Sequence, residues 1–143
     1  LLARSHSSVV HCPRSHTFFG HPKFPLKELA AAGINVCLGT DSLASIEGHG
    51  KKPPQLNMFS EMRAFARKNP GTPAGTILRL ATLNGAQALG LAGRIGEISQ
   101  GALADLIVIP CREKLADVLE AVLHHRGEVT ASMVGGTWAI APK

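Results

Sequence analysis

Asp41 occupies the position in this sequence that is best suited to chemistry. It follows the short apolar run Ile34–Leu38, which is typical of a β-strand and ends abruptly at Gly39. A carboxylate just beyond the C-terminal end of a buried parallel strand lies where α/β barrels and open α/β sheets place ligands and catalytic groups. Its oxygens could bind a metal ion or transfer a proton. The alternative is an Asp that merely caps a turn, with Gly39 and Ser42 as ordinary turn residues.

Several histidines are candidates for binding, and each has a plain structural alternative. His11 lies near the end of the run Ser8–Pro13, where a ring nitrogen could orient a ligand, contact substrate, or serve as a hydrogen-bonded structural histidine. The stretch Phe18–His21 could line a pocket, although an aromatic pair more often packs. His124 and His125 lie at the end of a predicted helix, where a positive charge is favourable.

The first part of the chain predicts the order strand, helix, strand. The β-branched run Ser8–Pro13 ends in a proline, which cannot donate to a sheet and therefore tends to end a strand. After a polar loop, Arg14–Pro25, the segment Leu26–Ala32 has helix formers and is followed by Gly33 at the usual left-handed position. With the strand Ile34–Leu38, this order predicts a right-handed parallel βαβ unit. Both strand ends should then open on the same rim.

The middle of the chain predicts a long loop followed by three helices. The loop Leu43–Gln55 holds two glycines and two prolines, so we expect it to be mobile and to act as a lid on the rim. The spacing of apolar residues predicts helices over Leu56–Lys68 and Ala74–Ala81 that cover the strands. Thr82 is suited to cap the N-terminus of a third helix running to Leu89.

The C-terminal part of the chain predicts a second, smaller sheet. An apolar strand, Asp105–Pro110, is stopped by its proline, and a helix should follow from about Glu113 to His125. The segments Val129–Val134 and Thr137–Ile140 flank the pair Gly135-Gly136, which is typical of the primed two-residue turn of a β-hairpin. We therefore expect these strands to form a separate small sheet beside the main α/β layer.

Length and composition exclude several classes of protein. The 143 residues, 45% of them hydrophobic, are enough for one domain with a core. No apolar run approaches the roughly 18 residues of a membrane helix, and residues 1–4 are too few and too soon polar to resemble a secretory signal. We therefore expect a cytoplasmic protein that does not enter a membrane. The net charge of +5 comes from scattered residues and only 4% of residues are aromatic, which argues against nucleic-acid binding. Three cysteines without a CxxC pair are typical of reduced thiols.

Five motifs, in this order and at compatible spacing, resemble the C-terminal part of the amidohydrolase superfamily, most closely its deaminase and chlorohydrolase branch. The resemblance covers nearly the whole chain. The motifs are His11-Cys12-Pro13-Arg14-Ser15, Leu38-Gly39-Thr40-Asp41-Ser42, Leu56-Asn57-Met58-Phe59-Ser60-Glu61-Met62, Thr82-Leu83-Asn84-Gly85-Ala86-Gln87-Ala88-Leu89-Gly90, and Gly101-Ala102-Leu103-Ala104-Asp105-Leu106-Ile107-Val108.

The resemblance implies an α/β fold in which residues 1–92 are the C-terminal part of a (β/α)8 TIM barrel. The two predicted strands would be barrel strands seven and eight, and residues 93–143 would add strands and one helix to a small β-sandwich. Asp41 would be the strand-eight metal ligand and a catalytic proton carrier, with zinc or iron as the divalent metal. A group of four further residues would bind substrate or support the ligands: His11, Ser15, His16 and Ser42.

The chain departs from the family pattern in two ways. His16 stands where members of this branch usually carry asparagine, which leaves the substrate open. The family's His-x-His pair, its histidines on strands five and six and its general-acid glutamate are not found, and we assign Glu61 to a covering helix. A whole barrel needs about 200 residues or more. We therefore expect a C-terminal piece of a longer enzyme.

The resemblance implies hydrolysis of carbon-nitrogen bonds other than peptide bonds. The reaction expected first is the deamination of an amino-substituted purine or pyrimidine by a water that a divalent metal activates. Removal of a chloride from a triazine-type ring is an alternative with the same attack by water. A second alternative is a non-catalytic half-barrel that needs a partner. In either case we expect the missing part of the barrel, or self-association, to cover the strand edges and the apolar faces of the helices over 56–89.

Overall fold

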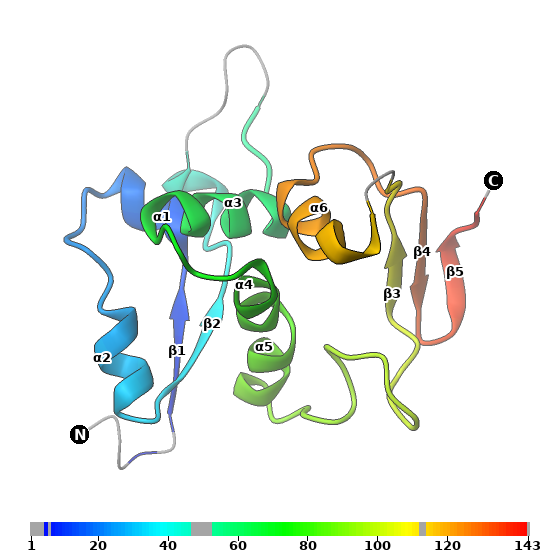
Figure 1. The fold of residues 1–143 in the computed structure, drawn as a ribbon, viewed down its shortest axis with the longest axis horizontal. Helices are drawn as coiled ribbons and strands as arrows, with labels where there is room; N and C mark the ends of the chain where they lie inside the picture. Colours follow the sequence, from blue (N-terminus) through cyan, green and yellow to red (C-terminus); the bar gives the residue numbers. More distant parts are fainter. Residues whose placement is uncertain (1–4, 6, 47–52, 112–113, 143) are drawn as a thin grey trace.

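The computed structural model describes residues 5, 7–46, 53–111 and 114–142, and it contains two separate sheets (Figure 1). In the first sheet, β1 (Ser8–His11) pairs in parallel with β2 (Asn35–Leu38), and His11 lies opposite Leu38. The connection contains α1 (Pro13–Phe18) and α2 (Leu26–Ala31). The predicted parallel strand-helix-strand unit is confirmed, and both strands end at the same edge.

Three helices follow and pack beside β2. Helix α3 (Met58–Lys68) begins at Asn57, whose Oδ1 accepts a hydrogen bond from the Ser60 amide at 3.1 Å. Helices α4 (Ala74–Ala81) and α5 (Leu83–Ala88) come next, and both contact β2. Asn84 of α5 donates from its side chain to the Val36 carbonyl at 2.7 Å, which joins this helix to the strand directly.

The second sheet has three antiparallel strands in sequence order: β3 (Leu106–Val108), β4 (Ala131–Val134) and β5 (Thr137–Ile140). Gly135 and Gly136 form the turn of the hairpin with φ values of 54° and 83°, which a primed turn requires. A short 3-10 turn, η3 (Leu115–Asp117), and α6 (Val118–His124) lie between β3 and β4 in sequence. Helix α6 contacts α3 and α4, so it joins the C-terminal segment to the first sheet's helices.

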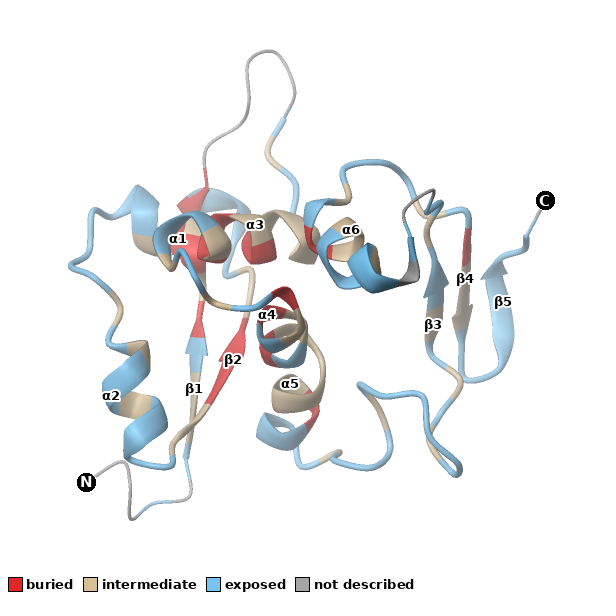
Figure 2. Ribbon diagram, in the orientation of Figure 1, coloured by how far each residue is buried: buried red, intermediate tan, exposed pale blue. Residues whose placement is uncertain are grey.

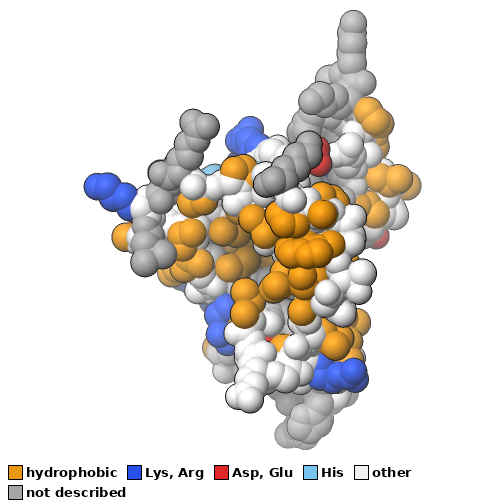
Figure 3. Space-filling view, turned by 90° about the vertical axis from the view of Figure 1, so that its right-hand side faces the viewer, with side chains coloured by type: hydrophobic (Ala, Val, Ile, Leu, Met, Phe, Trp, Pro, Cys, Tyr) orange, Lys and Arg blue, Asp and Glu red, His pale blue; other side chains and the backbone are white. Residues whose placement is uncertain are grey.

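The core lies between β2 and the helices that cover it (Figure 2). Its buried side chains are Val36, Leu38, Met62, Phe65, Ala74, Ile77, Leu80 and Leu123. The inward faces of α3 and α4 are thus covered within the chain by β2 and α6. Leu56 and Leu89, in the same part of the chain, remain exposed, so the expected cover by a partner or a missing part of the barrel stays a prediction. Apolar side chains do remain exposed on the second sheet, among them Val134, Trp138 and Ile140. Figure 3 views the molecule from the side on which this sheet lies and shows hydrophobic side chains gathered on that side.

Three local predictions differ from the structure in part or in full. The loop predicted over Arg14–Pro25 contains most of α1, because Pro13 starts a helix without losing an intrahelical hydrogen bond. Thr82 does occupy the predicted N-cap position of α5, but its side chain makes no capping hydrogen bond, since its hydroxyl donates back to the Leu78 carbonyl at 2.8 Å. The helix expected from about residue 113 begins only at Val118, after η3.

Two further expectations can be compared with the structure only over the residues that it describes. The predicted lid over residues 43–55 includes residues 47–52, which lie outside the described residues, and its described start is a 3-10 turn, η2 (Leu43–Ser45). Within the described part of the chain, no helix has the length and apolar character needed to cross a membrane.

We expect Phe65→Ala to lower the free energy of unfolding by about 3–5 kcal/mol, because Phe65 has 0% of its surface exposed and truncation leaves a cavity. The measurement is urea unfolding of the protein that contains this chain. Ile98→Ala is the control, since Ile98 is 90% exposed and its truncation should change the free energy by less than about 0.5 kcal/mol. Equal effects of the two substitutions would contradict this description of the core.

Candidate active site at the strand ends

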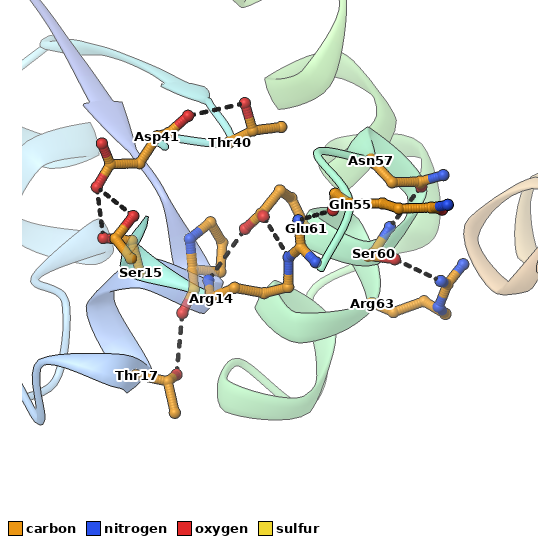
Figure 4. Close-up of polar contacts among 12 residues, drawn as sticks. Arg14, Ser15, Thr17, Thr40, Asp41, Gln55, Asn57, Ser60, Glu61 and Arg63 are labelled. Atoms are coloured by element: carbon orange, nitrogen blue, oxygen red, sulfur yellow. Dashed lines mark hydrogen bonds and ion pairs between the residues drawn. The ribbon is translucent and has the colours of Figure 1, made fainter. Parts of the chain in front are cut away.

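Asp41 and Ser15 meet at the edge where β1 and β2 end (Figure 4). The Ser15 hydroxyl donates to Asp41 Oδ2 at 2.6 Å, although the two residues are 26 positions apart. The Gly39 amide also donates to the His11 carbonyl at 2.9 Å, which continues the strand pairing up to this edge. The prediction that the two strand ends share one rim is therefore confirmed.

A second hydroxyl fixes the same oxygen of Asp41. Ser45, which is buried at the end of η2, donates to Asp41 Oδ2 at 2.9 Å. Ser45 Oγ also accepts from the Ser42 amide at 3.4 Å, so Ser42 supports the turn that carries Ser45. Both of these side-chain bonds go to Oδ2 of Asp41, and the Ser42 amide is a weaker donor to the same carboxylate. Neither serine hydroxyl binds Oδ1.

The backbone of Asp41 is strained. Its φ of 56° makes it the only residue other than glycine with a positive φ in the described ranges. Aspartate tolerates this left-handed conformation better than most residues, but the conformation still costs free energy and persists only where surrounding contacts impose it. The bonds from Ser15 and Ser45 are such contacts. This strained conformation at a strand end, held by two side chains, is typical of a functional position.

The environment of Asp41 favours its ionised form. The hydrogen bond from Ser15, and after it the bond from Ser45, lower the pKa of the Asp41 carboxyl below its ordinary value. Hydroxyl donors stabilise a carboxylate more than a neutral carboxylic acid. Asp41 is therefore an anion at neutral pH, ready to bind a cation or accept a proton.

His11 and His16 belong to a different cluster. His11 is only 6% exposed, and its ring stacks on Phe24 with centroids 3.9 Å apart. Burial, and then the neighbouring His16, lower the pKa of His11 to about 4, so its imidazole is neutral at pH 7. With His21 these rings line a cavity of about 370 Å³. The described contacts do not join His11 or His16 to Asp41, so their predicted role in substrate binding gains no geometric support here.

Sequence reasoning missed the role of Glu61. Its side chain is 0% exposed, and its two oxygens accept from Arg14: Oε1 from Arg14 Nε at 2.5 Å and Oε2 from the Arg14 amide at 3.0 Å. Glu61 lies on α3, as predicted, but on the inward face. The signal was its spacing, since Met58 and Phe65 lie one turn away on either side and are apolar. A carboxylate in such a stripe indicates a buried polar partner.

The described residues do not form a complete metal site. They contain no group of three or more His, Cys, Asp and Glu side chains that could hold a metal ion. A catalytic zinc site takes three protein ligands. Asp41 could serve as one ligand, because it is ionised, exposed at the rim and bound by the serine hydroxyls only at Oδ2. The structure therefore shows one candidate ligand.

Known proteins are similar to this chain over nearly its whole length. The model of the amidohydrolase family matches residues 1–139. A 5-methylthioadenosine/S-adenosylhomocysteine deaminase from Syntrophobacter fumaroxidans is 37% identical over 88% of this chain and 33% of its own length. The crystal structure of a zinc-bound adenosine deaminase from Xanthomonas campestris matches with a TM-score of 0.78 and 35% identity, over 93% of this chain and 32% of that one.

An atrazine chlorohydrolase from Arthrobacter aurescens, solved with zinc, matches with a TM-score of 0.73 and 23% identity. That match covers 96% of this chain and 32% of the chlorohydrolase. At this level of identity the likeness concerns the fold alone. The chain spans about a third of the length of the relatives it matches.

We expect Ser15→Ala to raise the pKa of Asp41 toward its ordinary value, because it removes the largest cause of the lowering. Ser45→Ala should raise the pKa by less. The measurement is the carboxyl carbon shift of Asp41 in metal-free protein, followed by NMR against pH. Thr40→Val is the control, since the Thr40 hydroxyl lies 3.5 Å from the Asp41 backbone carbonyl and does not reach its carboxylate. A pKa that is the same in all four proteins would contradict the assignment.

We expect Arg14→Met to lower the free energy of unfolding by about 3–5 kcal/mol, because it leaves the Glu61 carboxylate buried without a guanidinium. Chemical denaturation measures this change. Arg94→Met is the matched control at an exposed arginine, where the same substitution should have little effect. If Arg14→Met proved as mild as its control, the ion pair would not organise this part of the fold.

Proposed function

The chain belongs to the amidohydrolase family, and from that premise we propose that it forms the Asp41 side of a metal-dependent hydrolytic site in a longer deaminase. The observation that carries this proposal is the state of Asp41. It is ionised, its Oδ2 is held by the hydroxyls of Ser15 and Ser45, neither hydroxyl binds Oδ1, and it lies exposed at the end of a parallel strand. A carboxylate in this state is equipped to bind a divalent cation and to transfer a proton.

The architecture of the longer protein is part of the proposal. We assign β1 and β2 to barrel strands seven and eight, within a barrel portion of residues 1–92, and residues 93–143 to part of a small β-sandwich. The parallel pairing of β1 with β2 and the separate antiparallel sheet support this division. Helix α6 bridges the two portions, since it belongs to the second and packs on helices of the first.

The metal would be zinc or iron, held by Asp41 together with histidines that the family resemblance assigns to strands one, five and six of the longer protein. Asp41 would bind through Oδ1, because Oδ2 is engaged by two hydroxyls. When bound, a divalent metal lowers the pKa of a coordinated water toward about 7 and so supplies the nucleophile.

Asp41 also carries the proton of the reaction. Its carboxylate accepts a proton from the attacking water and passes it to the amino nitrogen, which leaves as ammonia when its bond to the ring carbon breaks. Ser15 and Ser45 keep the carboxylate oriented and ionised between turnovers. A positioned proton carrier of this kind contributes about 100-fold to 10,000-fold to a rate.

The proposed substrate is an amino-substituted purine or pyrimidine derivative. The Syntrophobacter relative is named for deamination of 5-methylthioadenosine and S-adenosylhomocysteine, and the Xanthomonas structure for deamination of adenosine. These two likenesses exceed 30% identity, whereas the likeness to the chlorohydrolase is one of fold alone. Deamination is therefore preferred over removal of a chloride.

We expect Asp41→Asn in the longer protein to lower the rate of ammonia release from adenosine or 5-methylthioadenosine by about 100-fold or more. Asparagine tolerates a positive φ, so the fold should be retained while the proton carrier is lost. Steady-state turnover with saturating zinc or iron, together with the circular dichroism spectrum, measures both. Glu28→Gln on the exposed side of α2 is the control and should leave turnover unchanged. A folded Asp41→Asn protein that kept a tenth of the original turnover would contradict the proposed role of Asp41 as proton carrier.

A further inference from the structure

A second cavity lies away from the Asp41 carboxylate and is rich in arginine. Its volume is about 450 Å³, and three arginines line it: Arg14 of α1, Arg63 of α3 and Arg126, which follows α6. Figure 4 shows Arg14 and Arg63 together with the polar lining residues Gln55, Asn57 and Ser60. Glu128 is the only carboxylate among the described lining residues.

The positive charges around this cavity are incompletely neutralised. Arg14 is paired with Glu61. Arg63 donates to the His125 carbonyl and, at 2.9 Å, to the Ser60 hydroxyl, neither of which is charged. Arg126 is exposed and makes no ion pair with any residue that the structure describes. Two guanidinium groups therefore face a space that holds one carboxylate.

Crowding of like charges adds to the imbalance. Burial lowers the pKa of Arg63, and the nearby Arg126, Arg67 and Arg14 lower it further. A bound anion would relieve this repulsion. In folded proteins, arginine forks that lack a carboxylate partner are suited to phosphate, because their N–H groups match its oxygens in pairs.

The other walls of the cavity suit a small organic ligand. Asn57, Phe59 and Ser60 are the start of α3, an 11-residue helix whose positive end therefore faces the same space. Pro53, Pro54 and Phe59 add apolar surface beside the arginines. A volume of about 450 Å³ exceeds the needs of a single phosphate ion and falls within the range of small-molecule pockets.

We propose that the cavity between Arg14, Arg63 and Arg126 binds a phosphate group, carried by a small organic molecule such as a nucleoside monophosphate. Arg63 and Arg126 bind the phosphate oxygens, and the start of α3 faces the same charge. The apolar walls receive the rest of the ligand. This site is separate from the Asp41 carboxylate and does not depend on the proposed deamination.

The test is calorimetric titration of the longer protein with inorganic phosphate, adenosine monophosphate and adenosine. We expect adenosine monophosphate to bind, and Arg126→Gln and Arg63→Gln each to weaken its binding by about tenfold or more, since each removes a charged hydrogen-bond donor. Arg94→Gln is the matched control at an exposed arginine outside the cavity and should change nothing. Binding should also persist in Asp41→Asn, which separates this site from the catalytic one.

The ligands distinguish the two sources of phosphate. Adenosine monophosphate that binds at least tenfold more tightly than inorganic phosphate supports an organic ligand, whereas equal affinities overturn that part and leave a site for free phosphate. The side chain of Arg126 is exposed, so the Arg126→Gln protein should fold normally. The test therefore remains valid even if the Arg63→Gln protein does not fold. Absence of binding by either phosphate at millimolar concentration, or unchanged affinity in Arg126→Gln and in folded Arg63→Gln, would refute the proposal.

Discussion

The ion pair between Glu61 and Arg14 is the contact on which the arrangement of the strand ends depends. Glu61 is fully buried on α3 and accepts both the side chain and the amide of Arg14, so α1 cannot shift without breaking two hydrogen bonds to a buried charge. Burial of a carboxylate is costly unless a partner compensates it, and loss of the partner leaves the cost in full. Because α1 is held in this way, the next residue, Ser15, is directed to Asp41.

This support explains how a strained aspartate is kept ready for chemistry. A left-handed backbone at Asp41 costs free energy, and the bonds from Ser15 and Ser45 offset that cost while they also hold the carboxylate ionised. Ser15 comes from the β1 side and Ser45 from the turn after β2, so both strand ends act on one oxygen. Neither hydroxyl binds Oδ1, through which the proposed metal would be held. The same contacts thus set the position and the charge of Asp41.

The carboxylate of Asp41 and the guanidinium groups of Arg63 and Arg126 lie at different sites on the chain. At the rim, Asp41 is ionised and can bind a cation. On the other side of the Glu61 ion pair, Arg63 and Arg126 surround a cavity that favours an anion. Arg14 lines that cavity, and its neighbour Ser15 bonds Asp41, so the two regions are one residue apart along α1. The fold thus brings three arginines that are far apart in the sequence to one cavity.

The sequence by itself determined several of the local elements and the place of Asp41 at the end of a strand. The bounds of α4, the hairpin around Gly135 and the parallel strand pair follow from patterns within a few residues, because propensity, turn chemistry and apolar spacing act locally. Only the tertiary structure decided which side chains meet. Glu61 and Arg14, which form the buried ion pair, are 47 positions apart in the sequence. The stacking of His11 on Phe24 likewise depends on packing that no local sequence pattern encodes. Such contacts arise when the elements are brought together, and their energies depend on burial, which the folded chain alone defines.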